Sequence, residues 1–232
     1  MQPDKSNLEK IKEITRAFLL LEPQPTKFPF IVQHPIFDST TVYLLNDDKP
    51  YNLLEPKDKV KVIDTFMEEI ESKDNITSLY LLIRTPYKLT WVKYCEEYFS
   101  DKDLAEYLAD AWVDSEDPNQ DVNCPISYLV KLFKKCKKEY LMTKEDYAVY
   151  QSIPDEIEVY RGVAVGRNPN GLSWTPDIVK AQWFANRFNT EKEVGYIEIA
   201  TVRKKEILAY FNTRGEKEIV VKVPKNRITI SF

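Results

Sequence analysis

The 232 residues suffice for one large domain or two small ones, with a hydrophobic core that needs no disulfide or metal. A net charge of −4 and an isoelectric point near 5.3 argue against non-specific coating of nucleic acid as the main activity. Three cysteines without metal-ligand spacing favour reduced thiols in a cytoplasm, and neither a secretion signal nor a membrane span is expected in this chain.

Residues 1–150 are predicted to be a mainly helical region. Apolar side chains recur at helical spacing over 8–21 and again from Pro56 onward. Further helices are expected over 87–99, 104–113, 126–140 and 144–150, the last capped by Thr143. Four prolines within 23–35 predict an extended crossing with little regular structure, and the composition of 115–121 indicates a loop.

Residues 151–232 are predicted to form a second domain, rich in strands. Strands are expected over 157–160, 195–202, 206–211, 218–223 and 227–230. Thr175-Pro176-Asp177 predicts a helix start, with the Thr175 hydroxyl as cap. One helix among several strands, after a helical half, predicts an α+β fold. The side chains expected on the buried face of that helix are Ile178, Ala181, Phe184, Ala185 and Phe188.

Three segments of this second domain carry side chains suited to chemistry on a dinucleotide. They are Val159-Tyr160-Arg161-Gly162, Leu172-Ser173-Trp174-Thr175, and Arg214-Gly215-Glu216-Lys217-Glu218. Arginine's planar fork suits a pyrophosphate, and a carboxylate stabilises the positive charge that develops on a ribose losing its base. On an extended backbone, Glu216 and Glu218 would share one face while Lys217 points away. Gly162 is expected to let a ligand approach the backbone.

In this order the three segments resemble the arginine, serine and Glu-x-Glu motifs of the R-S-E class of mono-ADP-ribosyltransferases. The resemblance covers about 157–223 and implies a C-terminal mixed β core of two packed sheets. It implies that Arg161 binds NAD+, with Gly162 and Thr175 nearby, and that Ser173 shapes the nicotinamide pocket and supports the catalytic glutamate. The middle motif departs from the family's Ser-Thr-Ser, so Thr175 is also a candidate helix cap.

The resemblance further implies roles for the two glutamates and for the loop before them. Glu218 would be the catalytic glutamate, and Glu216 would handle the acceptor. Phe211 is the best candidate for target recognition, with Tyr210 and Arg214 beside it. NAD+ would be the co-substrate, and no metal is expected. The helical region 1–150 would bind the target or regulate the activity.

The acceptor and the biological setting stay open at this stage. Protein arginine is the favoured acceptor, but relatives of the fold modify nucleic-acid bases, and the lysine-rich helix around 131–138 keeps single-stranded nucleic acid as an alternative. By analogy the chain is expected to be a toxin-like or phage-defence effector, with an antitoxin or immunity protein as a possible partner.

Two other functions compete with the transferase hypothesis. One is a binding module that kept the fold and lost the chemistry, and the other is an NAD+ glycohydrolase that uses water as acceptor. Taken singly, each motif has an ordinary structural explanation, such as a solvated strand edge or a helix cap. His34 is the only histidine and is expected to be a surface or packing residue, which weakens any Ser-His or Cys-His scheme.

Overall fold

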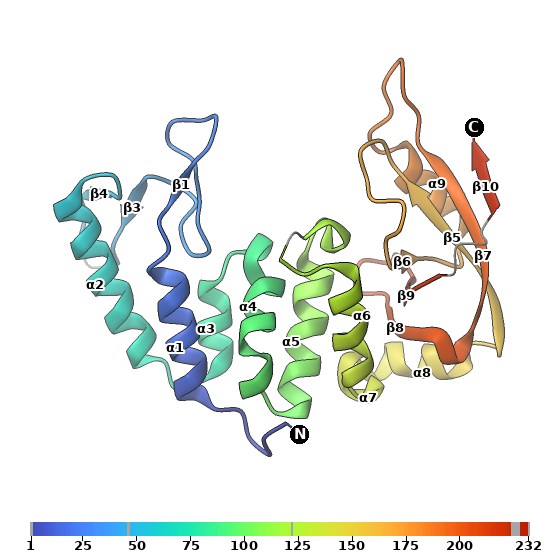
Figure 1. Cartoon of the computed structure of the whole chain (residues 1–232), viewed down its shortest axis with the longest axis horizontal. Coiled ribbons are helices and arrows are strands. Elements are labelled where there is room, and N and C mark those ends of the chain that lie inside the picture. The colour runs from blue at the N-terminus through green and yellow to red at the C-terminus, as the bar shows by residue number, and fades with distance from the viewer. Residues whose placement is uncertain (1, 46, 122, 224–227, 232) are drawn as a thin grey trace. The chain divides into compact units, whose positions relative to one another are not determined.

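The computed structural model describes residues 2–45, 47–121, 123–223 and 228–231 and confirms the α+β prediction, with most helices in the N-terminal half (Figure 1). Its contacts divide the chain into two units, Met1–Ser100 and Asp101–Phe232. The sequence predicts the domain boundary near residue 150, fifty residues after the boundary between these units. Four helices expected in the first domain therefore belong to the same unit as the long strands. No helix within the described ranges has both the length and the apolar composition that a bilayer crossing requires.

The first unit consists of helices and two small hairpins. Its helix α1 (Leu8–Leu19) is capped by Asn7 and packs against α2 (Pro56–Ser72), α3 (Ile76–Leu82) and α4 (Lys88–Cys95). The proline-rich stretch is less irregular than expected, since β1 (Gln24–Pro25) pairs with β2 (Val32–Gln33). The other elements are the hairpin of β3 (Thr41–Tyr43) and β4 (Pro50–Asn52), and the 3-10 turns η1 (Thr85–Tyr87) and η2 (Glu96–Tyr98).

His34 lies in this unit and has a packing role, as expected. Its side chain is buried, and its Nδ1 accepts from the backbone N–H groups of Ile36 and Phe37 at 3.1 Å each. Its ring stacks on that of Phe37, so the histidine fixes a turn of the chain.

The second unit begins with four helices, three of which pack against strand β8 (Ile207–Phe211). They are α5 (Asp101–Asp114), α6 (Ile126–Lys135), α7 (Lys138–Leu141) and α8 (Lys144–Ser152), with η3 (Pro118–Gln120) after α5; α6, α7 and α8 contact β8. Thr143 caps α8 as predicted, through a 3.1 Å bond from Asp146 N–H. The single helix expected over 126–140 is broken because Cys136 adopts an extended conformation, with ψ of 143°.

Two three-stranded sheets follow. One has the order β10 (Ile228–Ser231), β7 (Tyr196–Arg203), β5 (Glu156–Val163), and the other β6 (Ser173–Trp174), β9 (Glu218–Val221), β8. All of these described pairs are antiparallel. The expectation of mixed sheets is therefore corrected to antiparallel sheets. Strand β9 ends at Val221, two residues before the predicted end at 223, and the 3-10 turn η4 (Lys204–Glu206) precedes β8. The last strand is expected to start at Arg227, which is outside the described residues.

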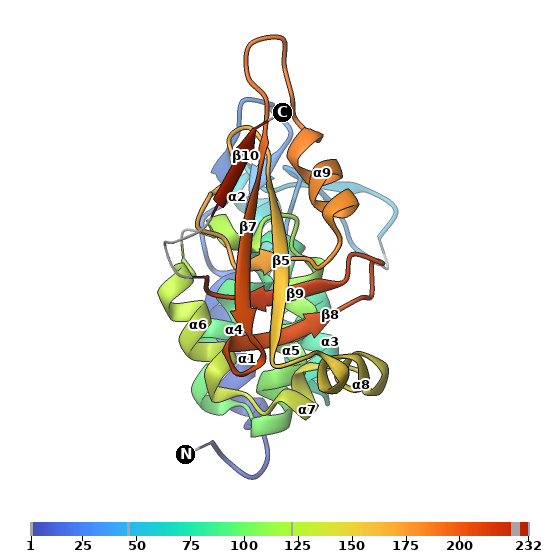
Figure 2. The same ribbon diagram turned by 90° about the vertical axis from the view of Figure 1, so that its right-hand side faces the viewer.

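Helix α9 (Ile178–Asn186) packs against β5 and β7, as Figure 2 shows. Its buried residues are Ala181 and Ala185, whereas the expected core residues Ile178 and Phe188 are each 41% exposed. Phe188 lies past the end of the helix, which explains why the helical periodicity misplaced it. The predicted cap is also corrected: Asp177, not Thr175, accepts from Val179 N–H and Lys180 N–H.

Gly162 is explained by this helix. A Cβ on Gly162 would lie 2.1 Å from the carbonyl oxygen of Ala181 and 2.6 Å from the backbone nitrogen of Ala185. The space that a side chain would occupy is filled by α9, while Gly162 also lines a cavity, so the expected approach of a ligand to its backbone stays a prediction. The glycine brings helix and strand together at a distance that no other residue allows.

Candidate active site

The two sheets of the second unit meet at one pair of residues, and this junction brings the first two motifs together. Tyr160 of β5 and Thr175, just after β6, exchange two backbone hydrogen bonds of 2.8 Å. Arg161 is therefore next to Tyr160, the residue that joins β5 to the segment containing Ser173. Two motifs that are twelve residues apart in the chain become neighbours across a sheet junction.

Arg161 is buried and holds the segment that leads into β6. Its Nη1 donates to the carbonyl of Ser173 at 2.7 Å and its Nη2 to the carbonyl of Asn168 at 2.8 Å. Its guanidinium lies against Gly171, where a Cβ would be only 2.1 Å from Nη2. In the strand register Arg161 is opposite Glu198, a buried carboxylate of β7. The planar fork thus shapes the cleft wall as well as supplying positive charge.

Ser173 and Glu218 are brought together by the pairing of β6 with β9. Ser173 is opposite Val220 and Trp174 is opposite Ile219, so Glu218 lies one step beyond the paired segment. The Ser173 side chain lies close enough to the Glu218 carboxylate to favour its charged form. The indole N–H of Trp112, from α5, donates to Oε1 of Glu218 at 3.1 Å. Trp112 therefore holds the carboxylate directly, with the Ser173 hydroxyl beside it.

Asn119, from η3, forms hydrogen bonds with Ser173 and with the residue before it. Its Nδ2 donates to Oγ of Ser173 at 3.1 Å, and its Oδ1 accepts from the backbone N–H of Leu172 at 2.6 Å. Its backbone carbonyl accepts from the Asn168 side chain at 2.9 Å. The short loop after α5 is in this way bonded to both ends of the segment 168–173.

The electrostatic state of Glu218 follows from these surroundings. Burial raises the pKa of its carboxyl above the ordinary value, and the nearby charge of Glu216 raises it further. The side chains of Ser173 and Trp112 and the charge of Arg161 oppose this rise in pKa. Perturbed titration of this kind, in a cleft, is typical of functional carboxylates.

The loop between β8 and β9 carries the two glutamates in an unexpected conformation. Lys217 has a φ of +50° and Gly215 a φ of +67°, so the backbone is not extended between Glu216 and Glu218. The alternation argument that predicted a common face for the two glutamates therefore does not apply. Both line the same cleft nonetheless, because the left-handed residue between them turns the chain.

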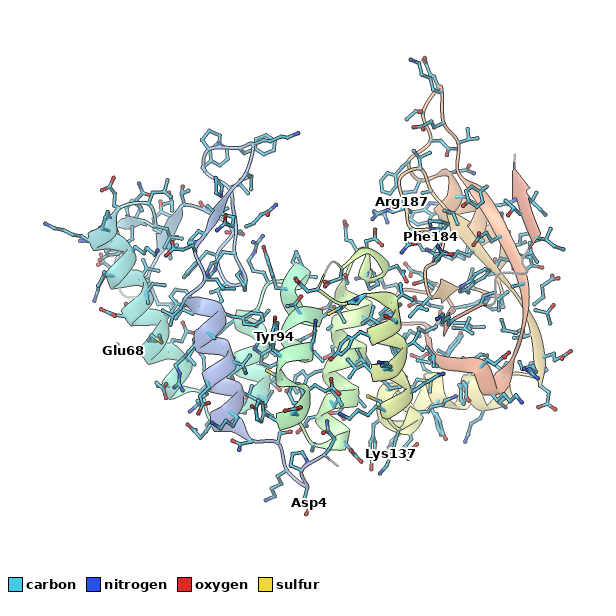
Figure 3. All side chains as sticks on the ribbon, in the orientation of Figure 1. Asp4, Glu68, Tyr94, Lys137, Phe184 and Arg187 are labelled. Atoms are coloured by element: carbon cyan, nitrogen blue, oxygen red, sulfur yellow. The ribbon has the colours of Figure 1, made fainter. Side chains whose placement is uncertain are left out.

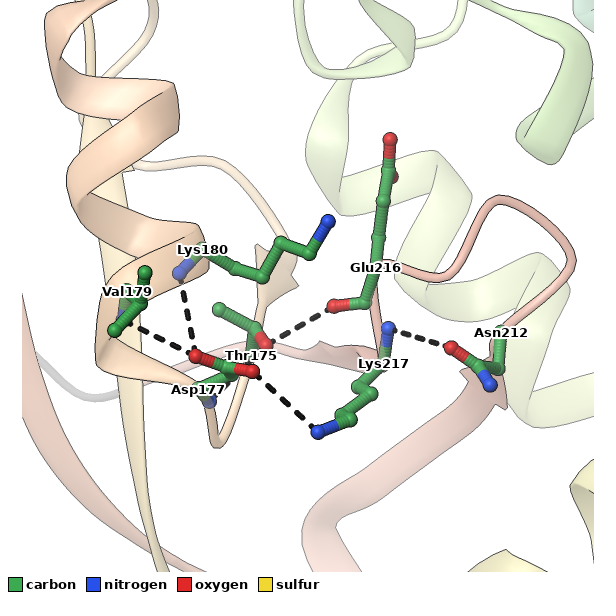
Figure 4. A network of polar contacts seen from close by, with 7 residues as sticks. All are labelled: Thr175, Asp177, Val179, Lys180, Asn212, Glu216 and Lys217. Carbon is green, nitrogen blue, oxygen red and sulfur yellow. Dashed lines mark hydrogen bonds and ion pairs between the residues drawn. The ribbon is translucent and has the colours of Figure 1, made fainter.

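A small polar network fixes this loop (Figure 4). The backbone N–H of Lys217 donates to Oδ1 of Asn212 at 3.0 Å, and Oγ1 of Thr175 donates to the carbonyl of Glu216 at 3.0 Å. The Lys217 ammonium pairs with the carboxylate of Asp177 at 3.4 Å. The cap of α9, the end of β6 and the glutamate loop are thus tied together, while the side chain of Glu216 points away from Thr175.

The cleft consists of two adjoining cavities of about 120 Å³ and 150 Å³. We call them the first and the second cavity. Both are lined by Glu116, Asn119, Ser173, Phe184, Arg187, Glu216 and Glu218. The first cavity is completed by Asp117, Tyr160, Arg161, Gly162, Ala164, Arg167, Trp174, Thr175 and Phe188. The second is completed by Trp112, Val113, Ser115, Pro118, Phe211, Thr213 and Arg214.

Most residues that the sequence singled out therefore meet in one cleft. Arg161, Gly162, Ser173 and Thr175 line the first cavity, and Phe211 and Arg214 the second. Tyr210 does not line either of them: its side chain is buried, and its backbone N–H lies 3.3 Å from Sδ of Met142. Strand alternation explains the difference, since adjacent residues of β8 point to opposite faces.

The structure adds aromatic and cationic side chains that the sequence did not single out. Phe184 and Arg187, near the end of α9, both line the cleft (Figure 3). The guanidiniums of Arg187 and Arg167 lie 5.3 Å and 5.0 Å from the ring centre of Phe188. Arg167 also pairs with Asp117 of the loop after α5.

These residues, with Trp112 and Asn119, come from helices and loops outside the three motifs. The Asn168-Pro169-Asn170-Gly171 turn is the one sequence signal near them, and it does not indicate a partner fifty residues earlier.

Comparison with known proteins found no matching family model, no matching curated protein and no matching solved structure.

Proposed function

We propose that this protein transfers ADP-ribose from NAD+ to a macromolecular acceptor, with protein arginine as the favoured acceptor. The observation that carries the proposal is the placement of Glu218. Its carboxylate is in a cleft, held by Trp112, with Ser173 and Arg161 close enough to affect its charge state. The order of the three motifs resembles the R-S-E transferases, and their side chains converge as that chemistry requires.

Glu218 would stabilise the sugar as the nicotinamide–ribose bond breaks. The bonding electrons leave with nicotinamide, and positive charge develops on the ribose. A fixed carboxylate in a desolvated site stabilises such charge, and removing a preorganised partner of this type costs on the order of 3–4 kcal/mol in the barrier. Glu218 must be anionic for this role, so its raised pKa sets the lower pH limit of activity.

The first cavity offers what a dinucleotide needs. Arg161, Arg167 and Arg187 supply guanidiniums for the pyrophosphate, and the rings of Tyr160, Phe184 and Phe188 supply stacking surfaces for its flat groups.

The second cavity is suited to the acceptor. Glu216 lines it together with Phe211 and Arg214, so a guanidinium entering there would approach the ribose from the side of Glu216. Glu216 would take the proton that the guanidinium nitrogen loses as it bonds to the ribose carbon. The bond to nicotinamide is replaced by one bond to nitrogen, and one proton is released.

We further propose a cytoplasmic site of action and a toxin-like or defence role, with a neutralising partner possible. The three cysteines, Cys95, Cys124 and Cys136, are all buried, which fits a reducing compartment.

The test is a transfer reaction with NAD+ labelled in its adenylate and a cell extract, followed by digestion with protease or nuclease. The proposal predicts label on macromolecules that protease removes and nuclease does not, and no label with Glu218→Gln. Removal by nuclease instead would identify a nucleic-acid acceptor. Free ADP-ribose without labelled macromolecule would identify a glycohydrolase, and the absence of nicotinamide release would indicate a binding module.

A further inference from the structure

The catalytic carboxylate proposed above is supported from outside the strands that carry the three motifs, by Trp112 directly and by Asn119 through Ser173. Trp112 belongs to α5 and Asn119 to η3, both at least forty residues before Arg161 in the chain. The indole of Trp112 is buried, and its ring makes an edge-on contact with Phe133, with centroids 5.2 Å apart and planes at 86°. Its N–H is therefore aimed at Oε1 of Glu218 by close packing.

The side-chain amide of Asn119 has a fixed orientation. Its oxygen accepts from the backbone N–H of Leu172 at 2.6 Å, which requires an acceptor at that position. Its nitrogen must then be the atom that faces Ser173 Oγ at 3.1 Å. Since Asn119 donates to the hydroxyl oxygen, the single hydroxyl proton is free to face another acceptor, and the Glu218 carboxylate is close enough for Ser173 to favour its charged form.

We propose that Trp112 and Asn119 are positioning residues for Glu218: Trp112 holds one carboxylate oxygen directly, and Asn119 directs the Ser173 hydroxyl proton to the carboxylate. This inference rests on the transferase proposal for its catalytic consequence, but its geometric content can be tested without any activity. It assigns a function to the end of α5 and the loop after it, which a resemblance limited to 157–223 does not reach.

Removing the Trp112 N–H or the Asn119 amide is expected to change the pKa of Glu218. The Trp112 bond favours the charged carboxylate, so its loss raises the pKa of Glu218 beyond its already raised position. The other charged groups around the carboxylate stay in place in both variants. They are Arg161 on β5, Glu216 on the loop, and Glu116, Asp117, Arg167, Arg187 and Arg214 around the cleft.

The first experiment compares the pH dependence of nicotinamide release by the full chain and by Trp112→Phe, which keeps an aromatic ring against Phe133. The low-pH limit of kcat should move to higher pH, and kcat near neutral pH should fall about tenfold with KM for NAD+ nearly unchanged, because ground-state binding is not altered. Phe133→Leu loosens the packing that orients the indole but keeps the N–H, so it should move the low-pH limit less than Trp112→Phe does. An unchanged limit in Trp112→Phe, or an equal shift in Phe133→Leu, overturns the proposal.

The second experiment uses the four indole N–H resonances of the chain in an NMR titration. The Trp112 signal, identified by its loss in Trp112→Phe, should move with the titration of Glu218 and stay constant with pH in Glu218→Gln. Asn119→Ala removes the donor to Ser173 without adding a charge, so it should move the midpoint of the Glu218 titration to higher pH. An indole signal that does not respond to Glu218→Gln overturns the positioning role. A responding signal without nicotinamide release refutes the transferase proposal and leaves the geometry intact.

Discussion

Gly171 lies against the guanidinium of Arg161 so closely that a Cβ would be 2.1 Å from Nη2 and 2.5 Å from Cζ. We expect Gly171→Ala to displace the guanidinium and break its bonds to the carbonyls of Ser173 and Asn168. In the proposed complex the displaced guanidinium would also lose a charged hydrogen bond to the pyrophosphate, which contributes about 1.5–3 kcal/mol, so NAD+ should bind roughly tenfold to a hundredfold more weakly. Isothermal titration calorimetry with NAD+ measures this effect.

Gly166→Ala is the matched control. Gly166 has a φ of +76°, but its Cβ would meet nothing within 4 Å. This variant should lose some stability through backbone strain and keep its NAD+ affinity. Equal affinity loss in both variants would show that Arg161 has no special part in binding.

Gly162→Ala is expected to act on folding. Its Cβ would collide with the backbone of Ala181 and Ala185, atoms that move only if the whole helix α9 moves. Overpacking of this kind should destabilise the protein by about 3 kcal/mol. Urea unfolding measures the loss, and a variant as stable as the original would contradict the close packing of α9 on β5.

Glu218→Gln should stabilise the protein at neutral pH. The pKa of Glu218 is raised by folding, so the folded state takes up a proton in the range between the ordinary and the raised pKa. The contribution of Glu218 to stability therefore falls as pH rises through that range, and glutamine avoids the loss. Thermal unfolding at several pH values should show a Gln variant with a higher Tm at about pH 7 and little difference below about pH 4. A Tm advantage that grows as pH falls would refute the desolvated carboxylate.

Phe211 and Tyr210 offer a paired test of the acceptor side. Phe211 lines the second cavity, whereas Tyr210 is buried on the other face of β8. Phe211→Ala should lower transfer to a macromolecule about tenfold or more while nicotinamide release in water changes little. Tyr210→Phe, which removes only a hydroxyl, should leave both rates within about twofold. Equal losses of both rates in Phe211→Ala would remove this residue from acceptor recognition.

The sequence predicts the parts of the site that depend on local pattern. Alternation and β-branched residues identify β5 and β7, and Arg161 and Ser173 follow from motif order. The resemblance implies the grouping of Ser173 with Glu218, and the structure achieves it by pairing β6 with β9.

What sequence reasoning missed depends on tertiary packing. Trp112 is one of several apolar residues on α5, and nothing in its surroundings indicates that its N–H points to a carboxylate 106 residues later. Asn119 belongs to a loop that reads as solvated by composition, yet it is buried and bonded to Ser173. Lys217 adopts φ of +50°, a conformation rare for lysine that its neighbours impose. Local propensity does not determine any of these three features.

The most direct test of the central claim is the rate of nicotinamide release from NAD+ by the purified chain and by Glu218→Gln. If the carboxylate held by Trp112, with Ser173 beside it, stabilises the ribosyl cation, the chain releases nicotinamide and the glutamine variant does so about 10²–10³-fold more slowly, with NAD+ binding retained. Equal rates in the two proteins, or no release by the unaltered chain with any acceptor offered, would contradict it.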